Sequence, residues 1–550
     1  MAGQLRELPT SVKLLRREIF KEVAKVAFES EPENVNDQIE AIPYKITPTE
    51  EPRFFESIYR ERAIAAERVR LAMGMSLRPL DKPVHVTEGL TQSNISDKYY
   101  EPPLMQVIPS ACDKCKDNVY EVSNQCRNCV AKACVAACPK DAISIIDGKA
   151  YIDQEKCVHC GKCKKACPYD AIAHKVRPCS AACGIKAITT DELGRAKIDN
   201  DKCLGCGQCM VSCPFAAIAD KSQIFQMIQA IKKGDYLVAE LAPAIVGQFG
   251  ENVSLAMIKG ALLDLGFKEV HEVASGADVA CSTEAHAYVS EVVSGKLPFL
   301  LTSCCPSWAM LAKKQFPTLI GEVSQALTPM VATARKIKQK TPNARVVFIG
   351  PCAAKKLEAS RESVRSDVDF VITFEELSSI FEAKNVDFSK YADQHSIHQA
   401  TGAGRGYAIA GGVASAIEKC IKEYYPGVEV KIEHAEGLEE CKKMLLLAKA
   451  GKKNGCLIEG MGCPGGCVAG AGTNVSIVKA TSEVKKVVDT STKPLPPKDL
   501  YEIDLPYSHK KHRGELPLRN SPLFHFYFFF LNSFIPLVEP PSQSTSTPAR

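Results

Sequence analysis

The chain has 550 residues, 25 of them cysteine, and a formal net charge of +5. That length predicts several domains, and so small a positive excess gives no case for nucleic acid as a partner. Disulfides would explain the cysteines in a secreted protein, but no signal peptide is predicted because charged residues interrupt the first apolar stretches. We therefore predict a reducing compartment, in which the thiols bind metal.

Two helices are predicted in the first part of the chain. The apolar residues of Ser11–Phe28 fall on one helical face. Its acidic Glu18 and Glu22 argue against a mitochondrial presequence, which is poor in acids, although that alternative stays open. A second helix is predicted at Phe54–Met73, among polar and proline-containing segments. We interpret residues 1–105 as a helical lead-in of unknown role.

Residues 106–221 are dense in cysteine, and the pattern CxxCxxCxxxCP occurs in them twice. In such a repeat three thiolates bind one [4Fe-4S] cubane, while the fourth cysteine, before the proline, binds a neighbouring cubane. We therefore predict an α+β region of ferredoxin-like iron–sulfur repeats. A structural zinc site would not explain the doubled four-cysteine period. The two predicted ligand sets are Cys157, Cys160, Cys163 and Cys213, and Cys203, Cys206, Cys209 and Cys167.

Eight further cysteines in this region are less regular. Four of them precede PKDAI and form a degenerate repeat with one lengthened loop, and the others are two separated pairs. Sixteen thiolates would suit four cubanes. The pairing of these eight stays open, as does a zinc site at Cys112 and Cys115. The degenerate repeat contains Cys126, Cys129, Cys134 and Cys138, and the pairs are Cys112 with Cys115 and Cys179 with Cys183.

From about Ser222 onward, short apolar strands alternate with longer helical segments. This alternation predicts an α/β region of two lobes with mainly parallel sheets over residues 222–490. The predicted strands are Tyr236–Leu241, Leu297–Thr302, Arg345–Ile349, Phe370–Thr373, Val428–Glu433 and Cys456–Glu459, and the helices include Val253–Leu265 and Gly437–Ala450.

Three of these strands run into cysteine motifs, TSCCPSW, GPCAAKKLE and EGMGCPGGC. Ligands of open α/β sheets bind beyond the carboxyl ends of the strands, so we expect the three motifs to meet in one deep metal pocket. Cys304 and Cys305 are adjacent in the first motif. Neighbouring side chains of an extended segment point to opposite sides, so one thiol could bind metal while the other stays free.

Those three motifs, in that order after ferredoxin repeats, resemble the signature of the iron-only ([FeFe]) hydrogenases. The similarity covers Cys112 to Val478, with support from ELAPAIV, FVITFEEL and AGGVASAIE. The resemblance implies a [4Fe-4S] cubane that one cysteine sulfur bridges to a two-iron unit with carbonyl, cyanide and aza-dithiolate ligands. The implied cubane ligands are Cys305, Cys352, Cys463 and Cys467, of which Cys467 is the bridge.

The resemblance also implies roles for residues around that cofactor. Cys304 would pass protons to the dithiolate amine, since a thiol can release and regain a proton near neutral pH. Lys355 would hydrogen-bond a cyanide ligand and pair with Glu358, three residues later. The other implied residues are Glu284 and Ser324 on the proton path, Ala242 and Pro243 against the diatomic ligands, and Met461 beside the two irons.

The sequence departs from the best-known pattern of that family. Gly350 stands where methionine is usual, Ala287 where a second path glutamate is usual, and Ala244 where a polar residue is usual. The last glycine-rich run is AGAGT. These changes are similar to those of a subgroup with extra N-terminal cysteines, and they put the proton exit in question. His286 is an alternative proton carrier, although a packed or surface histidine is the plainer interpretation.

The resemblance therefore implies a ferredoxin-type [FeFe] hydrogenase that reversibly reduces protons to dihydrogen, with electrons from ferredoxin or a similar soluble carrier relayed through [4Fe-4S] clusters. It further implies maturation machinery, and the cytoplasm or a reducing organelle such as the hydrogenosome. Two alternatives stay open: a hydrogenase-like iron–sulfur assembly or scaffold protein without the two-iron unit, and a hydrogen sensor. Cys304, Lys355 and Glu358 favour the enzyme because a plain cubane carrier does not need them.

Residues 491–550 are predicted to be a C-terminal extension. Tyr507–Glu515 is cationic, as a docking or capping strand would be, and Leu523–Val538 is strongly apolar. The apolar run is short for a membrane span and contains Asn532 and Pro536, so no membrane span is predicted.

Overall fold

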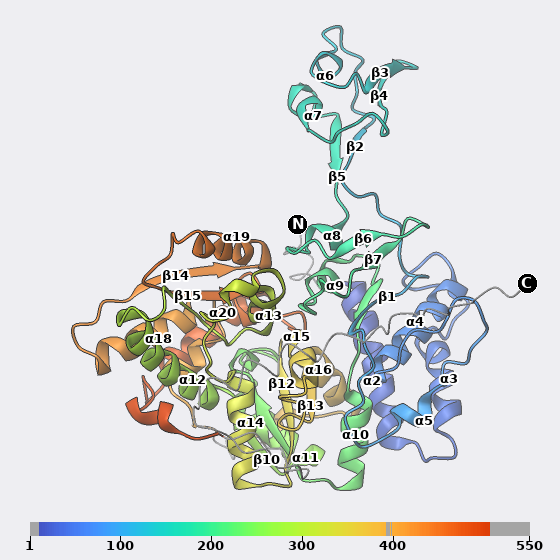
Figure 1. Ribbon diagram of the computed structural model, residues 1–550. Coiled ribbons are helices and arrows are strands. Elements are labelled where there is room, and N and C mark those ends of the chain that lie inside the picture. The colour runs from blue at the N-terminus through green and yellow to red at the C-terminus, as the bar shows by residue number, and fades with distance from the viewer. Residues whose placement is uncertain (1–9, 392–396, 398, 506–550) are drawn as a thin grey trace, which may run out of the picture. The chain divides into compact units, whose positions relative to one another are not determined.

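The computed structural model describes residues 10–391, 397 and 399–505 (Figure 1). Residues 1–508 form one compact unit, and residues 509–550 are a second unit, which lies outside the described residues. The predicted tail segments Tyr507–Glu515 and Leu523–Val538 also lie outside them. Within the described ranges no helix has both the length and the apolar character that a membrane crossing needs.

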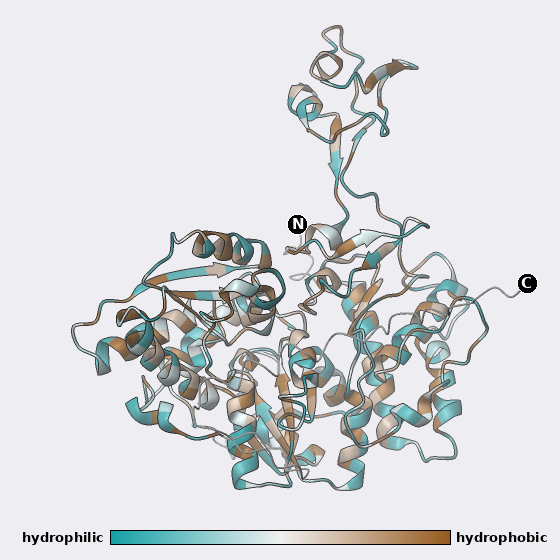
Figure 2. Ribbon diagram, viewed as in Figure 1, coloured by the Kyte–Doolittle hydropathy of each residue, from teal (hydrophilic) through white to brown (hydrophobic). Residues whose placement is uncertain are grey.

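Three long helices make up most of the lead-in: α2 (Ser11–Glu29), α3 (Val35–Ile46) and α4 (Ile58–Ala72). Thr10 caps α2, because its side chain accepts a hydrogen bond from the Lys13 backbone N–H. Polar and apolar residues alternate along α3 and α4 in Figure 2, as amphipathic helices require. Two of these helices were predicted; α3 was not, and it contains Pro43, a residue that normally interrupts a helix. The short α5 (Leu90–Ser93) follows.

The lead-in shares its apolar core with the α/β region. Buried residues of α2, α3 and α4 belong to the same cluster as the strands of the larger sheet. Helix α2 packs against both α10 (Ile224–Lys233) and α16 (Phe374–Ala383). The predicted boundary at residue 105 is therefore not a break in packing, and the predicted domain limits stay predictions.

The cysteine-rich region consists of short antiparallel strand pairs, one nested inside another. The outer pair β1–β8 spans the region, and the pair β2–β5 closes an inner segment, residues 119–175. Two further pairs, β3–β4 and β6–β7, lie inside and outside that segment respectively. The strands are β1 (Met105–Val107), β2 (Val119–Val122), β3 (Ile143–Ile146), β4 (Lys149–Ile152), β5 (Ile172–Lys175), β6 (Ile188–Thr190), β7 (Ala196–Ile198) and β8 (Ile218–Asp220). The short helices are α6 (Ala133–Ala136), α7 (Lys162–Ala166), α8 (Pro178–Ala181) and α9 (Gln208–Ser212).

The α/β region contains two parallel sheets, so the predicted parallel arrangement is confirmed. The larger has the order β10-β9-β12-β13 and the smaller the order β11-β15-β14. Helices pack against the larger sheet, and every residue of its central strands is buried except Arg345, the first residue of β12. Whether the two sheets define two lobes stays a prediction. The strands are β9 (Leu237–Leu241), β10 (Glu269–Glu272), β11 (Leu300–Leu301), β12 (Arg345–Gly350), β13 (Phe370–Thr373), β14 (Lys431–Glu436) and β15 (Cys456–Met461).

Helices surround these sheets, and two of them, α13 and α15, begin at loops that carry cysteine motifs. They are α11 (Leu255–Leu265), α12 (Ala274–Ala287), α13 (Pro306–Gln315), α14 (Pro329–Lys340), α15 (Ala354–Ser360), α17 (Gly402–Gly406), α18 (Gly412–Tyr424), α19 (Leu438–Lys449) and α20 (Ile477–Asp489). Short 3-10 helices include η1 (Pro243–Ile245) and η5 (Cys467–Ala469).

Candidate metal centre

The three cysteine motifs follow β11, β12 and β15, at the carboxyl ends of these strands. Cys305 caps the N-terminus of α13, where Pro306 occupies the first turn and needs no hydrogen-bond acceptor for its nitrogen. Cys352 lies two residues after β12, and Cys467 begins η5. The local structure thus holds each thiol on a short, tight connection rather than on a long loop.

The four predicted cubane ligands lie close together. Burial raises the pKa of Cys467 well above its ordinary value, and the nearby Cys305, Cys352 and Cys463 raise it further. Burial also raises the pKa of Cys352 to about 12, with Cys463 and Cys305 again adding to the effect. The Gly462 N–H donates a 3.3 Å hydrogen bond to Cys305 Sγ. Sulfurs from three distant motifs therefore gather in one place, as a cubane requires.

Cys304 has a different environment from Cys305. Cys305 contacts both the apolar cluster around Trp308 and the one around Met461, whereas Cys304 contacts only the latter. Burial raises the pKa of Cys304 well above its ordinary value, and Glu284 is its strongest charged neighbour. The adjacent thiols therefore have different surroundings, as the alternation of extended side chains predicted, and their different roles stay a prediction.

Glu284 lies on α12, directly behind Cys304. Its Oε1 accepts hydrogen bonds from the Ser303 N–H at 2.9 Å and the Ser303 hydroxyl at 3.2 Å. Burial raises its pKa to about 7, although these bonds and the nearby Ser324 hydroxyl oppose the rise. At neutral pH the carboxyl group is therefore present in both protonation states.

Lys355 and Glu358 form a buried ion pair on α15, with 2.6 Å between Nζ and Oε2. The Thr328 hydroxyl donates to the other oxygen of Glu358 at 2.6 Å. Burial opposes the charge of Lys355, but Glu358 outweighs it, so the pKa of the lysine rises. Its ammonium group in turn lowers the pKa of Cys352 and Cys467, which places a positive charge beside the gathered thiols.

The remaining predicted residues lie around the same motifs. The Ala242 N–H donates to the Ile349 carbonyl at 2.9 Å, which holds the turn that begins η1 at Pro243 against β12. Met461, at the end of β15, is buried in the apolar cluster that Cys304 and Cys305 contact. The chemistry of this donor set, four thiols and one ammonium group, fits an anionic iron–sulfur cofactor.

The inner segment (residues 119–175) and the rest of the cysteine-rich region, which we call the outer unit, each hold their own cysteine groups. This corrects the predicted pairing. Burial raises the pKa of Cys179 to about 12, and Cys213, Cys112 and Cys115 are its cysteine neighbours. Burial likewise raises the pKa of Cys209, and its neighbours include Cys183, Cys203 and Cys206. Two groups of four thus form without any cysteine of residues 119–175: Cys112, Cys115, Cys179 and Cys213, and Cys183, Cys203, Cys206 and Cys209.

The inner segment contains the other eight cysteines of the region. Burial raises the pKa of Cys134, which has Cys167 and Cys126 as neighbours. A small cavity is lined by Cys138 together with three thiols of one regular repeat, Cys157, Cys160 and Cys163. The predicted exchange of Cys167 and Cys213 between the two regular repeats is therefore wrong. Each regular repeat instead exchanges its fourth cysteine with the irregular run in its own unit.

The group around Cys206 lies next to the three cysteine motifs of the α/β region. Cys352 is among the charged neighbours of Cys206, whose pKa burial raises to about 12. The Gln208 amide donates to Cys463 Sγ at 3.2 Å. Gly207 adopts a positive φ of 77°, and a Cβ there would lie 2.5 Å from the Ala471 Cβ. Only glycine permits both this backbone conformation and this close approach.

Within the described ranges, no three Cys, His, Asp or Glu side chains are arranged as one metal ion would require. A cubane is a different case, because its four thiolates bind four separate irons.

Comparison with known families agrees with these groups. Residues 235–471 match the family described as iron only hydrogenase large subunit, C-terminal domain. Residues 150–173 match a 4Fe-4S binding domain, and residues 173–224 match the LdpA Fe-S cluster-binding domain. Residues 235–471 therefore belong to the iron-only hydrogenase family.

Relatives within and around this hydrogenase family match different shares of the chain. Iron hydrogenase 1 of Clostridium pasteurianum is 27% identical over 394 residues, 62% of this chain and 68% of that protein. The NADP-reducing hydrogenase subunit HndD of Solidesulfovibrio fructosivorans is 27% identical over 444 residues, 68% of this chain and 74% of that subunit. The cytosolic Fe-S cluster assembly factor NAR1 of Kluyveromyces lactis is 36% identical over only 96 residues, 18% of this chain and 20% of that protein.

Local contacts explain one departure from the hydrogenase pattern, Gly350, and bear on the alternative proton carrier, His286. A Cβ at Gly350 would lie 2.4 Å from the Phe348 ring, so Phe348 fills the space beside this position on β12. His286 stacks on Tyr501 with ring centroids 4.1 Å apart, and its Nδ1 lies 3.2 Å from the Tyr425 hydroxyl. These contacts favour the plainer interpretation of His286 as a packed residue.

One buried residue near the hydrogenase motifs was missed in the sequence. Glu240 on β9 is fully buried, and neither carboxyl oxygen has a hydrogen-bond partner among the described residues. Burial raises its pKa well above the ordinary value, although the nearby Lys355 opposes this. The available signal was a single acidic residue inside the apolar strand LVAEL.

Proposed function

We propose that this chain is an [FeFe] hydrogenase that reversibly combines protons and electrons into dihydrogen. The observation that carries the proposal is the grouping of Cys304 and Lys355 with the thiols of Cys305, Cys352 and Cys467. A protein that only held a cubane would need neither an additional free thiol nor a buried ammonium group at that position.

In this proposal the four motif cysteines would hold a [4Fe-4S] cubane, and Cys467 would also serve as the cysteine ligand nearest to the two-iron unit. When bound, that unit supplies the metal chemistry at which protons and electrons combine. Lys355 stabilises the anionic cofactor, and Glu358 keeps the lysine charged and oriented. Ala242 and Met461 are buried and, with the partly buried Pro243, form apolar surroundings for the cofactor.

Proton transfer is assigned to Cys304, Glu284 and Ser324. A general acid or base is most effective when its pKa is near the working pH, and Glu284 meets this condition with a pKa of about 7. Its hydrogen bonds from Ser303 hold the carboxyl group beside the Cys304 loop. The route beyond Ser324 differs from the usual family path, because Ala287 has no titratable group.

Electrons are proposed to arrive through four [4Fe-4S] clusters, two in residues 119–175 and two in the outer unit. Support comes from the four groups of four thiols and from the close approach of the outer unit, at Cys206 and Gln208, to Cys352 and Cys463. A ferredoxin or similar soluble carrier is the proposed donor, in the cytoplasm or in a reducing anaerobic organelle. Maturation machinery would supply the two-iron unit.

The second candidate is an iron–sulfur assembly factor that lacks the two-iron unit. The 36% identity to the assembly factor NAR1 over 96 residues favours it. A hydrogen sensor would use the same cofactor as the enzyme but turn over slowly.

Infrared spectroscopy of anaerobically matured protein tests the proposal. Carbonyl and cyanide bands together with rapid dihydrogen evolution are expected for the enzyme, whereas the same bands with slow turnover identify a sensor. Full iron and sulfide content without those bands, after maturation that succeeds for a known hydrogenase, would assign the chain to the assembly factors.

A further inference from the structure

Helix α4 of the lead-in covers one side of the thiol group Cys112, Cys115, Cys179 and Cys213. Ile64 and Leu71 of this helix belong to the same buried cluster as Cys213, with Cys112 in contact at its edge. The Arg60 Nε–H donates to the Ser110 carbonyl at 2.9 Å, close to Cys112 in the chain. The lead-in therefore shields the Cys213 side of this group from water, and charges on α4 act on that side through a medium of low dielectric constant.

Arg68 is a buried cation of α4 that lies near Cys213 of this group. It is 5% exposed, and its guanidinium donates to the carbonyl of Ala216, three residues after Cys213. Burial lowers its pKa to about 10, and Cys213 acts in the opposite direction. Arg68 therefore stays positively charged at neutral pH, and its Nε has no hydrogen-bond partner among the described residues.

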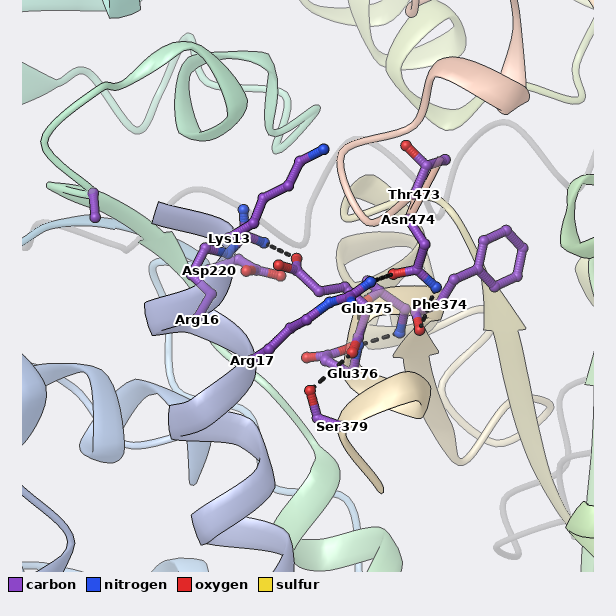
Figure 3. A network of polar contacts seen from close by, with 12 residues as sticks. Lys13, Arg16, Arg17, Asp220, Phe374, Glu375, Glu376, Ser379, Thr473 and Asn474 are labelled. Carbon is purple, nitrogen blue, oxygen red and sulfur yellow. Dashed lines mark hydrogen bonds and ion pairs between the residues drawn. The ribbon is translucent and has the colours of Figure 1, made fainter. Parts of the chain in front are cut away.

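The neighbouring carboxylates are already paired with other cations. Arg16 lies 2.5 Å from Glu375, in the network that Figure 3 shows between α2 and α16. Lys356 binds two carboxylates, at 2.7 Å from Asp220 and 2.8 Å from Glu376. Within the described part of the chain, no carboxylate lies within ion-pair distance of Arg68.

A second cation near the group has a different role. Arg177 opposes the rise in the pKa of Cys179 that burial causes. Its side chain also donates to the carbonyls of Cys115, Thr189 and Gly194. Arg177 therefore stabilises the backbone around the cysteines through hydrogen bonds. Arg68 has one backbone acceptor and an unsatisfied Nε, so its side chain does not hold the chain together as Arg177 does.

We propose that Arg68 is an electrostatic positioning residue that raises the reduction potential of the [4Fe-4S] cluster held by Cys112, Cys115, Cys179 and Cys213. This inference rests on the iron–sulfur part of the proposed function and is independent of the two-iron unit. Reduction adds one electron and no proton, so the cluster gains one negative charge. A buried cation beside it stabilises the reduced form more than the oxidised form. The lead-in thereby gains a function in electron relay.

An anaerobic redox titration of the full, reconstituted chain, followed by electron paramagnetic resonance, tests this. The signal of this cluster is assigned by its loss in Cys115→Ala. In Arg68→Gln we expect the ratio of reduced to oxidised cluster at a fixed potential to fall about tenfold, which is 59 mV for a one-electron couple. Arg68→Lys keeps the charge and should stay near the wild-type value.

Arg62→Gln is the matched control, since Arg62 lies on the same helix but bonds to Thr47. Its potential should equal that of the wild type. An unchanged potential in Arg68→Gln with full iron and sulfide content would overturn the proposal. A shift in Arg68→Lys as large as that in Arg68→Gln would also overturn it, because the hydrogen bond to Ala216 and not the charge would then be responsible.

Arg68→Met provides a second neutral variant, which removes the donor to the Ala216 carbonyl but adds no polar side-chain atom of its own. If both neutral variants lose the cluster while Arg68→Lys retains it at the wild-type potential, the requirement for charge is supported. Loss of the cluster in all three variants would assign Arg68 a purely structural role. All of these potentials can be measured whether or not the chain carries carbonyl and cyanide ligands, so failure here is distinct from failure of the hydrogenase proposal.

Discussion

The two regular cysteine repeats have the same spacing but different surroundings. In the inner segment Cys160 is exposed although Cys163 is buried, and three lysines of α7, Lys162, Lys164 and Lys165, are exposed as well. In the outer unit Cys213 is buried, and burial raises the pKa of Cys209 well above its ordinary value. A repeated motif therefore fixes how cysteines bind a cluster, while the surrounding chain determines whether that cluster faces solvent or a buried partner.

Removal of residues 119–175 is expected to have the largest effect. The register pairs Val119 with Lys175, so the ends of the segment are adjacent and a short Gly-Ser link can replace it. About eight irons should be lost, four for each of two cubanes, while the outer unit keeps its own. Dihydrogen evolution from a protein carrier should fall about 100-fold, whereas evolution from a small redox dye should change little.

Cys209→Ala is the matched control for this removal. It lies in the unit next to Cys352, so it should reduce evolution from both donors. Iron analysis and parallel assays with the two donors provide the measurement. If removal of the segment caused the loss of all four cubanes of the cysteine-rich region, the nested arrangement would be contradicted. The original prediction, in which the two regular repeats exchange Cys167 and Cys213, would then be favoured.

This nesting could not be predicted from spacing. Cys115 and Cys179 are separated by an entire second unit, and nothing in the motif tells which cysteines meet until β2 pairs with β5. Cluster type, by contrast, was predictable, because CxxCxxCxxxCP limits the chemistry by itself. The sequence therefore predicted what the thiols bind but not which of them act together.

Within the α/β region the most apolar strands were predictable. Phe370–Thr373 agrees in both limits with β13, whose residues are all buried. β14 begins three residues later than predicted, since it lies at the edge of its sheet and only one of its residues is buried. Periodicity is a weak signal where burial is weak. Glu240 was missed for the opposite reason, because full burial of a carboxyl group contradicts the average behaviour of that residue type.

A smaller effect is expected at Glu284, which lies in the proposed catalytic pocket and not in the cysteine-rich region. Burial raises its pKa from 4.5 to about 7. The stability that its neutral form contributes is therefore fully present below pH 4.5 and is lost as the pH rises through 7. Glu284→Gln is neutral at every pH, so its unfolding free energy relative to the wild type should increase by about 3 kcal/mol between pH 4 and pH 8.

Thermal unfolding at a series of pH values, together with dihydrogen evolution from a dye, measures this effect. Evolution should fall in Glu284→Gln because an amide cannot release a proton. Asp278→Asn is the control on the same helix: burial raises the pKa of Asp278 to about 6, but its carboxyl group bonds to Thr401. It should alter stability without altering the pH profile of evolution. Equal profiles for wild type and Glu284→Gln would remove Glu284 from the proton route.

The smallest expected effect concerns the solvent-facing repeat. Among the described residues, Lys162, Lys164 and Lys165 have no ion-pair partner, so their charges are available to an acidic electron carrier. Replacement of all three by glutamine should raise the KM for such a carrier about threefold to tenfold, mainly at low salt, because exposed charges act on encounter more than on the bound complex. The rate with a small dye should not change.

Three exposed lysines elsewhere serve as the control for that replacement, namely Lys449, Lys452 and Lys485. Their replacement by glutamine removes the same net charge from the chain but leaves the surface around Cys160 unaltered. If both triple variants raise the KM equally, the carrier responds to net charge alone and the exposed repeat is not its docking surface. If only the first does so, the contrast between the two repeats extends from their burial to their partners: the exposed repeat receives electrons and the buried one delivers them.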